Sequence, residues 1–245
     1  MAKEGRIGLT STALRYIAMV FMLLDHMWAT LISGNNWMTY VGRMAMPIFA
    51  FLVAEGYVHT GNLKKYKMRL FLFGILSEIP FNLMAGGRCI FPFHQNIMFT
   101  LLIGLLVIER IDAIRKNKAP KEICKNGFII VGLCILSVIT FVDYNITGVL
   151  TVVLFYVLRR VPFAPVWQLV GMVLINIVLQ KGMYIPITIG SVTFEFITQG
   201  FAVFSLLFIW FYNGKKGCSK KWVQYFAYVF YPLHMLVLYM IWLLV

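Results

Sequence analysis

The sequence predicts an all-α polytopic membrane protein, and two observations carry this prediction. The chain has 245 residues, of which 61% are hydrophobic and only 13% are charged, whereas charged residues make up about 25% of an average soluble domain. Apolar runs recur along the whole chain, and several approach the ~20 residues that a helix needs to cross a bilayer. No hydrophilic segment or linker interrupts these runs, so we predict a single integral-membrane domain over residues 1–245.

The apolar runs predict about nine transmembrane helices, some of them short enough to be tilted or discontinuous. In chain order we expect them at 13–33, 41–59, 68–86, 95–112, 126–142, 146–160, 164–180, 198–213 and 222–244. The segments 146–160 and 164–180 are either two tilted spans or one re-entrant pair, because Arg159, Arg160 and Pro162 separate them. Residues 181–199 are polar enough to predict an outer loop, which either covers the mouth of a site or is an ordinary connection.

Three prolines occur well inside predicted helices. Pro47, Pro80 and Pro232 lack the backbone N–H that a helix interior uses, so each is expected to kink its span. Such breaks are tolerated in a membrane where a cavity or a neighbouring polar group satisfies the freed carbonyl. The three prolines therefore favour polar cavities close to these helices.

The basic residues predict the orientation of the chain. Of the 22 lysines and arginines, all but Arg43, Arg88 and Lys181 fall on the side of the amino terminus, beginning with Lys3 and Arg6. Cytoplasmic loops are enriched in these residues, so we expect a cytoplasmic amino terminus and, after an odd number of spans, an outer carboxyl terminus. The same bias explains the net charge of +13 without a nucleic-acid partner.

A first group of polar residues is predicted to line a cavity between the membrane midplane and the outer surface. Ionisable groups in a span are costly and usually serve chemistry or transport. The group is Asp25, His26, Arg43, Glu78, Asn82, His94, Asn96, Asp143 and His234. Two simpler interpretations stay open: Asp25 and Arg43 neutralise each other, and Glu78 is kept protonated by burial.

A second group lies towards the cytoplasmic side. Glu55 and His59 are one helical turn apart and share a face. Lys64, Lys65 and Arg69 follow, and they suit either the phosphates of a cytoplasmic cofactor or simple anchoring at the membrane surface. The four cysteines are scattered without a Cys-x-x-Cys pair, so no metal site is predicted.

The polar motifs together resemble the TraX family. They are Leu24-Asp25-His26, then Arg43 with Pro47-Ile48-Phe49-Ala50-Phe51, Ala54-Glu55-Gly56 and His59-Thr60, then Ser77-Glu78-Ile79-Pro80-Phe81-Asn82, His94-Gln95-Asn96 with Phe99-Thr100, and Tyr231-Pro232-Leu233-His234. The resemblance covers most of the chain and is densest in its first 100 residues. It implies an integral-membrane acyltransferase domain, because the family is named for the enzyme that acetylates the amino terminus of conjugative pilin with acetyl-CoA.

The resemblance implies acetyl transfer from cytoplasmic acetyl-CoA to an amine or hydroxyl acceptor at a bacterial cytoplasmic membrane. The acceptor is open, with a peptide and a glycan among the candidates, and so is the oligomeric state. Histidine is the natural base for this reaction because its pKa is near neutral. We expect His26 to be the base or a transient acyl carrier, with His94 as the second candidate.

The other site residues receive supporting roles in this hypothesis. Asp25, Glu78 and Arg43 would set the protonation of the base, and Asn96 or Arg43 would stabilise the oxyanion. The donor side is predicted at Glu55, His59, Lys64, Lys65 and Arg69, with Asn96 and His234 as further donor-binding candidates. Two rival functions stay open: a proton-coupled transporter or exporter of a small molecule, and a haem protein with two histidine ligands.

Overall fold

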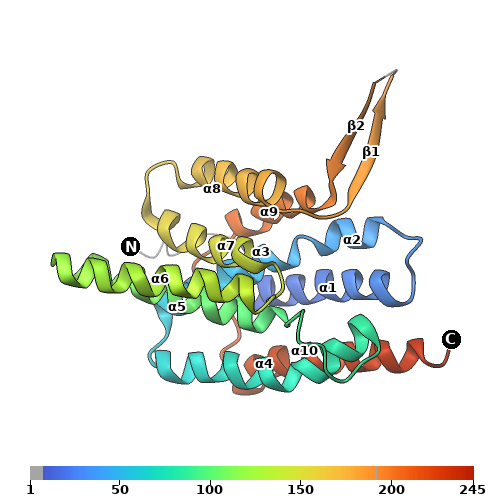
Figure 1. Ribbon diagram of the computed structural model, residues 1–245, viewed down its shortest axis with the longest axis horizontal. Helices are drawn as coiled ribbons and strands as arrows, with labels where there is room; N and C mark the ends of the chain where they lie inside the picture. Colours follow the sequence, from blue (N-terminus) through green and yellow to red (C-terminus); the bar gives the residue numbers. More distant parts are fainter. Residues whose placement is uncertain (1–7, 191) are drawn as a thin grey trace. The chain divides into compact units, whose positions relative to one another are not determined.

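The structure is a computed structural model that describes residues 8–190 and 192–245 (Figure 1). The described chain is mostly helical and divides into two compact units, which are treated separately below. Unit 1 consists of Met1–Phe49 and Arg160–Ala227, and unit 2 consists of Ala50–Arg159 and Tyr228–Val245. Lys3 and Arg6, which the predicted orientation uses, lie outside the described residues.

Unit 1 is built from two helical segments that are far apart in the sequence. The first segment holds α1 (Ser11–Thr30) and α2 (Trp37–Gly42), which pack against each other. The second holds α8 (Ala164–Val173), the π-helix η2 (Leu174–Leu179), the 3₁₀ helix η3 (Thr198–Phe204) and α9 (Ser205–Trp210). The rings of Tyr40 and Phe201 stack at a centroid distance of 4.6 Å, so α2 and η3 join the two segments.

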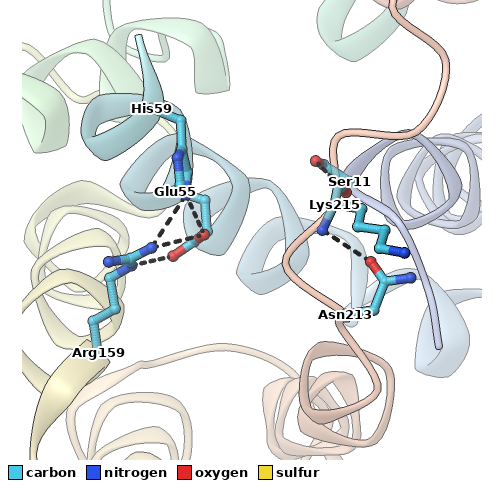
Figure 2. Close-up of polar contacts among 6 residues, drawn as sticks. All are labelled: Ser11, Glu55, His59, Arg159, Asn213 and Lys215. Carbon is cyan, nitrogen blue, oxygen red and sulfur yellow. Dashed lines mark hydrogen bonds and ion pairs between the residues drawn. The ribbon is translucent and has the colours of Figure 1, made fainter. Parts of the chain in front are cut away.

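The start of α1 is held by the loop that follows α9. The hydroxyl of Thr10 caps α1 by accepting the N–H of Ala13 at 3.2 Å. The N–H of Ser11 donates to the carbonyl of Lys215 at 2.9 Å, and the side chain of Asn213 accepts the N–H of Lys215 at 2.9 Å (Figure 2). These contacts tie the first described residues to a loop about 200 positions later in the chain.

Gly42 lets α1 and α2 approach closely. A Cβ atom at this position would fall on the side chain of Asp25, whose Cγ would lie 2.8 Å away. We expect Gly42→Ala to destabilise the protein by about 1–3 kcal/mol, because overpacking forces the two helices apart. The measurement is the unfolding midpoint in detergent. Gly34→Ala is the control, since nothing lies within 4 Å of the added Cβ, and equal midpoints for the two variants would contradict the expectation.

The prediction of a loop over residues 181–199 is wrong, because the structure forms a β-hairpin there. Strand β1 (Tyr184–Ile189) pairs antiparallel with β2 (Val192–Ile197), and the hairpin projects from the helices of unit 1 (Figure 1). The β-branched and aromatic residues that alternate along both strands favour this conformation. Gly190 supplies a positive φ of 62° at the turn. Polarity alone suggested a loop, whereas the alternation was the signal for a hairpin.

Unit 2 is a helical bundle centred on α5 (Ile97–Lys116). The helices α4 (Leu63–Gly86), α6 (Pro120–Ile139) and α7 (Asn145–Val157) each pack against α5. The short 3₁₀ helix η1 (Leu158–Arg160) follows α7, while most of α3 (Ala45–His59) and the second half of α10 (Lys221–Trp242) complete the unit. Ile103 and Val107 of α5 are buried together with Val142 and Val149.

The helices are those of a membrane protein. Within the described residues, four helical segments are long and apolar enough to cross a bilayer: Trp37–His59, Leu63–Gly86, Pro120–Ile139 and Tyr225–Trp242. On α6 the apolar side chains point outwards, and Phe128 is 80% exposed, as expected of a lipid-facing helix. The other predicted spans form shorter, less apolar or more charged helices, so the nine crossings and the orientation stay predictions.

The predicted helix 41–59 is not continuous. It consists of α2 and α3, and Arg43 and Met44 lie between them. Pro47 consequently falls in the first turn of α3, where a proline is tolerated, and it still lies within the apolar segment Trp37–His59. Pro80 and Pro232 do lie inside α4 and α10. The break leaves Arg43 at a helix end, close to the side chains of α1 described below.

Candidate functional site

The first polar cluster of unit 2 forms where α4 ends and α5 begins. The chain returns from Gly86 to Ile97, and Gln95 pairs with the segment that precedes α7. The N–H of Gln95 donates to Phe141 at 3.0 Å, and the N–H of Asp143 donates to Gln95 at 2.8 Å. This backbone pairing sets His94 beside Asp143, and we call His94, Asp143, Glu78, Asn96 and Asn82 the His94 cluster.

His94 and Asp143 form a histidine–carboxylate pair. Their Nε2 and Oδ1 atoms are 3.6 Å apart, and the histidine side chain is 45% exposed. The ring of Phe81 meets the imidazole edge-on at a centroid distance of 4.9 Å. The neighbouring carboxylate of Asp143 raises the pKa of His94 above its usual value, although burial opposes it. Because the carboxylate holds Nε2, the other nitrogen, Nδ1, is the one placed to exchange a proton.

Glu78 and Asn96 connect α4 to the start of α5. The Asn96 amide donates to Glu78 Oε2 at 3.1 Å and to the carbonyl of Gly74 at 2.8 Å. Its oxygen caps α5 by accepting the N–H of Met98 at 3.0 Å. The side chain is fully buried. Both amide donors are therefore used inside the protein, which leaves neither for the oxyanion or donor contacts predicted for Asn96.

A pocket of about 320 Å³ opens beside His94. Its lining includes Asn82, Arg88 and the rings of Phe81 and Phe91. The Asn82 amide donates weakly to the carbonyl of Cys89 at 3.5 Å. Asn82 is only 5% exposed, and its Oδ1 atom has no partner among the described residues. Buried polar atoms without partners are rare, and since this oxygen has almost no accessible surface, a ligand donor reaches it only after a small movement of the lining side chains.

The second polar cluster of unit 2 joins the end of α3 to η1, the short helix that follows α7 (Figure 2). Arg159 donates to Glu55 through Nε at 2.5 Å and through Nη2 at 3.4 Å. His59 Nε2 lies 3.3 Å from Glu55 Oε2 and 3.2 Å from Arg159 Nη2. The Glu55 side chain is 9% exposed and that of His59 is 57% exposed. The buried carboxylate is thus paired, and the histidine is its accessible neighbour.

Some cationic residues around this second cluster contact another side chain, and others are exposed to solvent. Lys67 is paired with Glu109 at 3.0 Å, and Arg69 lies over the ring of Tyr66 at 5.6 Å. Lys64 and Lys65 are exposed in the first turn of α4, which Asn62 caps by accepting the N–H of Lys65 at 2.8 Å. The two lysines are therefore the accessible cations of the predicted donor side.

The polar residues of α1 and α2 form a separate cluster in unit 1. Asp25 Oδ1 accepts the hydroxyl of Thr39 at 2.6 Å and lies 3.3 Å from Arg43 Nη2. Arg43 also donates to Thr39 at 2.8 Å. This is the mutual neutralisation that the sequence left open for Asp25 and Arg43. His26 lies next to Asp25 on the partly buried part of α1, and its carbonyl accepts the hydroxyl of Thr30 at 2.7 Å.

His234 is held by its own helix. Its Nδ1 lies 2.8 Å from the carbonyl of Phe230, and its ring stacks on that of Phe230 at 4.8 Å. The side chain is buried. This arrangement is that of a packed helix residue, and the donor-binding role predicted for His234 gains no support from it.

The structure thus brings the predicted site residues together in three groups. Glu78, His94 and Asn96 meet in unit 2, Glu55 and His59 meet elsewhere in that unit, and Asp25 and Arg43 meet in unit 1. Three important partners received no catalytic or binding role from the sequence: Asp143, Arg88 and Arg159. The sequence placed both Asp143 and His94 on the outer side of the membrane, and this shared position was the signal that the two residues could meet. Arg159 was interpreted only as a topological marker.

The fold and the clusters define a helical membrane protein with buried polar sites at helix ends. Residues 10–242 match the family described as TraX protein, and the chain belongs to this family. The chain is similar to the probable fimbrial assembly protein FimC, serogroup H1, of Dichelobacter nodosus, with 29% identity over 245 residues that cover 95% of each chain. No solved structure matches the chain.

Proposed function

We propose that the protein is a multi-pass acetyltransferase of the bacterial cytoplasmic membrane that moves an acetyl group from acetyl-CoA to an amine acceptor. The observation that carries this proposal is the His94–Asp143 pair beside a pocket. A histidine oriented by a carboxylate is a general base that recurs in acyl transfer. Membership of the TraX family, named for a pilin acetylase, supports the same chemistry.

The proposed reaction uses His94 as the base. Nδ1 takes a proton from the amine while the nitrogen attacks the thioester carbonyl, and Asp143 stabilises the resulting imidazolium. The carbon–sulfur bond then breaks, and the proton passes to the departing thiolate to give free CoA. His26 remains the rival base, since Asp25 directly precedes it in the sequence.

The donor side is proposed at Glu55, His59, Lys64, Lys65 and Arg69. The N-terminal lysines of α4 suit the phosphates of CoA. His94 lies beyond the other end of this helix of 24 residues, which is about 36 Å long at 1.5 Å per residue. The arm of CoA is shorter than this helix, so the lysines serve as an entry site, and the proposal requires acetyl-CoA to leave them and move towards His94 before the thioester reacts.

The test adds acetyl-CoA to purified protein in nanodiscs and follows the release of free CoA together with the mass of added amine acceptors. We expect CoA release that depends on the acceptor, with one acetyl group gained per acceptor. Intact-protein mass spectrometry after rapid quenching tests for an acetyl-enzyme. Absence of CoA release, of calorimetric acetyl-CoA binding and of acetylated product would overturn the proposal and favour the proton-coupled transporter.

A further inference from the structure

The pocket beside His94 contains an arrangement of groups that the general reaction does not require. A base and a thioester suffice for acetyl transfer, yet the lining also offers a buried acceptor, two aromatic rings and a guanidinium. These groups differ in depth, because Asn82 is 5% exposed whereas Arg88 is exposed. A pocket whose deep part and mouth present different chemical groups favours a ligand that carries matching groups at its two ends.

The inner part of the pocket suits an amine. Asn82 Oδ1 accepts hydrogen bonds only, and it lacks a donor among the described residues. The ring of Phe91 lines the same space and offers a face to an organic cation. Glu78 and Asp143 are both close enough to His94 to interact with its charge. The carboxylates and the amide oxygen thus favour a positively charged or hydrogen-donating group near the base.

The mouth of the pocket suits an anion. Arg88 lines the pocket, and no carboxylate of the described residues lies within ion-pair distance of it. This distinguishes it from Arg43 and Arg159, which are paired with Asp25 and Glu55. A guanidinium binds phosphate or carboxylate through two parallel hydrogen bonds. An unpaired arginine at the edge of a pocket is therefore a recognition group for an anionic substituent.

We propose that the acceptor is a zwitterionic amine of the phosphoethanolamine type, whose phosphate binds Arg88 while its amine reaches Asn82 and His94. This inference rests on the proposed function and names its substrate class. The ammonium first releases a proton to water, and the neutral nitrogen then attacks the thioester. The nitrogen–carbon bond forms, the carbon–sulfur bond breaks, and His94 carries the second proton to the thiolate.

The test compares acceptors that differ only in the anion. Soluble O-phosphoethanolamine is compared with ethanolamine, and nanodiscs of phosphatidylethanolamine are compared with nanodiscs of phosphatidylcholine, whose nitrogen is fully substituted. We expect acetylation of O-phosphoethanolamine, of phosphatidylethanolamine or of both, and the two arms tell a soluble source from a lipid one. Equal use of ethanolamine, or preference for a neutral peptide with a free amino terminus, would overturn the inference.

Variants of the pocket residues test which side chains recognise the acceptor. Arg88→Gln should raise the KM for the phosphorylated acceptor by about 10-fold or more, because a charge-assisted hydrogen bond is lost, while kcat and the KM for acetyl-CoA stay unchanged. Arg88→Lys should restore part of the loss. Asn82→Leu should raise the KM for ethanolamine and O-phosphoethanolamine alike. Arg160→Gln is the control, as another exposed arginine, and an unchanged KM in Arg88→Gln would refute the anion site.

A binding measurement separates this inference from the proposed function. Calorimetry with O-phosphoethanolamine, without acetyl-CoA, should show binding to the wild-type protein that is lost in Arg88→Gln. If this binding is found but no acetyl group is transferred, the proposed function fails and the recognition of the zwitterion stands. If acetyl transfer to other amines is found without this binding, the proposed function stands and the inference fails.

Discussion

Replacing His94 with alanine is expected to lower kcat for acetyl transfer by about 10²- to 10⁴-fold, the usual contribution of a general base. His94 lies beside the pocket with its Nε2 held by Asp143, so removing it takes away the group that accepts the proton of the amine. Acetyl-CoA binding should persist, because the proposed donor side lies at the other end of α4. The measurement is steady-state CoA release, with calorimetry for acetyl-CoA.

His26→Ala is the matched comparison for this prediction. Both histidines neighbour an acidic group, and the ring of His94 lies 3.6 Å from its carboxylate partner at the edge of a pocket. We expect the His26 variant to retain measurable transfer when it is folded in detergent. Full activity in His94→Ala together with loss in His26→Ala would move the base to α1.

Asp143→Asn gives a second measurement on the same pair. The carboxylate of Asp143 raises the pKa of His94, so the asparagine variant should lower that pKa. Since the neutral imidazole is the active base, the rising limb of the pH–rate profile should move to lower pH. The plateau rate should fall at the same time, because the ring loses the partner that orients it. A change in the plateau without a shift of the limb would indicate a purely structural role.

Replacing Arg159 with alanine is expected to reduce stability by about 3 kcal/mol, because removing one partner of a buried ion pair leaves the other charge uncompensated. The Glu55 side chain is only 9% exposed, and Arg159 contacts both of its oxygens. His59 also contacts Glu55, but it is mostly exposed and is a weaker substitute. The measurement is the unfolding midpoint in detergent.

Arg160→Ala is the control for this experiment, because the neighbouring arginine is exposed. Adding Glu55→Gln to Arg159→Ala should recover part of the lost stability, since the double variant buries no unpaired carboxylate. If Arg159→Ala and Arg160→Ala unfold at the same midpoint, the ion pair contributes nothing to stability and its role is limited to ligand binding.

The sequence by itself determined the helical membrane character, the approximate position of each helix and the family. Apolar runs have the length of a bilayer, and this constraint acts locally along the chain, so it is readable residue by residue. The same local information failed at Arg43, where one apolar run breaks into α2 and α3, and at 184–197, where alternating side chains form a hairpin.

Only the tertiary structure decided which polar residues act together. His94 and Asp143 are 49 positions apart in the numbering, and Glu55 and Arg159 are separated by 104. Each pair depends on how helices pack and how two loops align, here through the pairing of Gln95 with Val142. Sequence favoured His26 because its acidic neighbour is adjacent in the chain. Packing also sets His94, in the segment between α4 and α5, beside Asp143, because polar contacts depend on distance in space and not on distance along the chain.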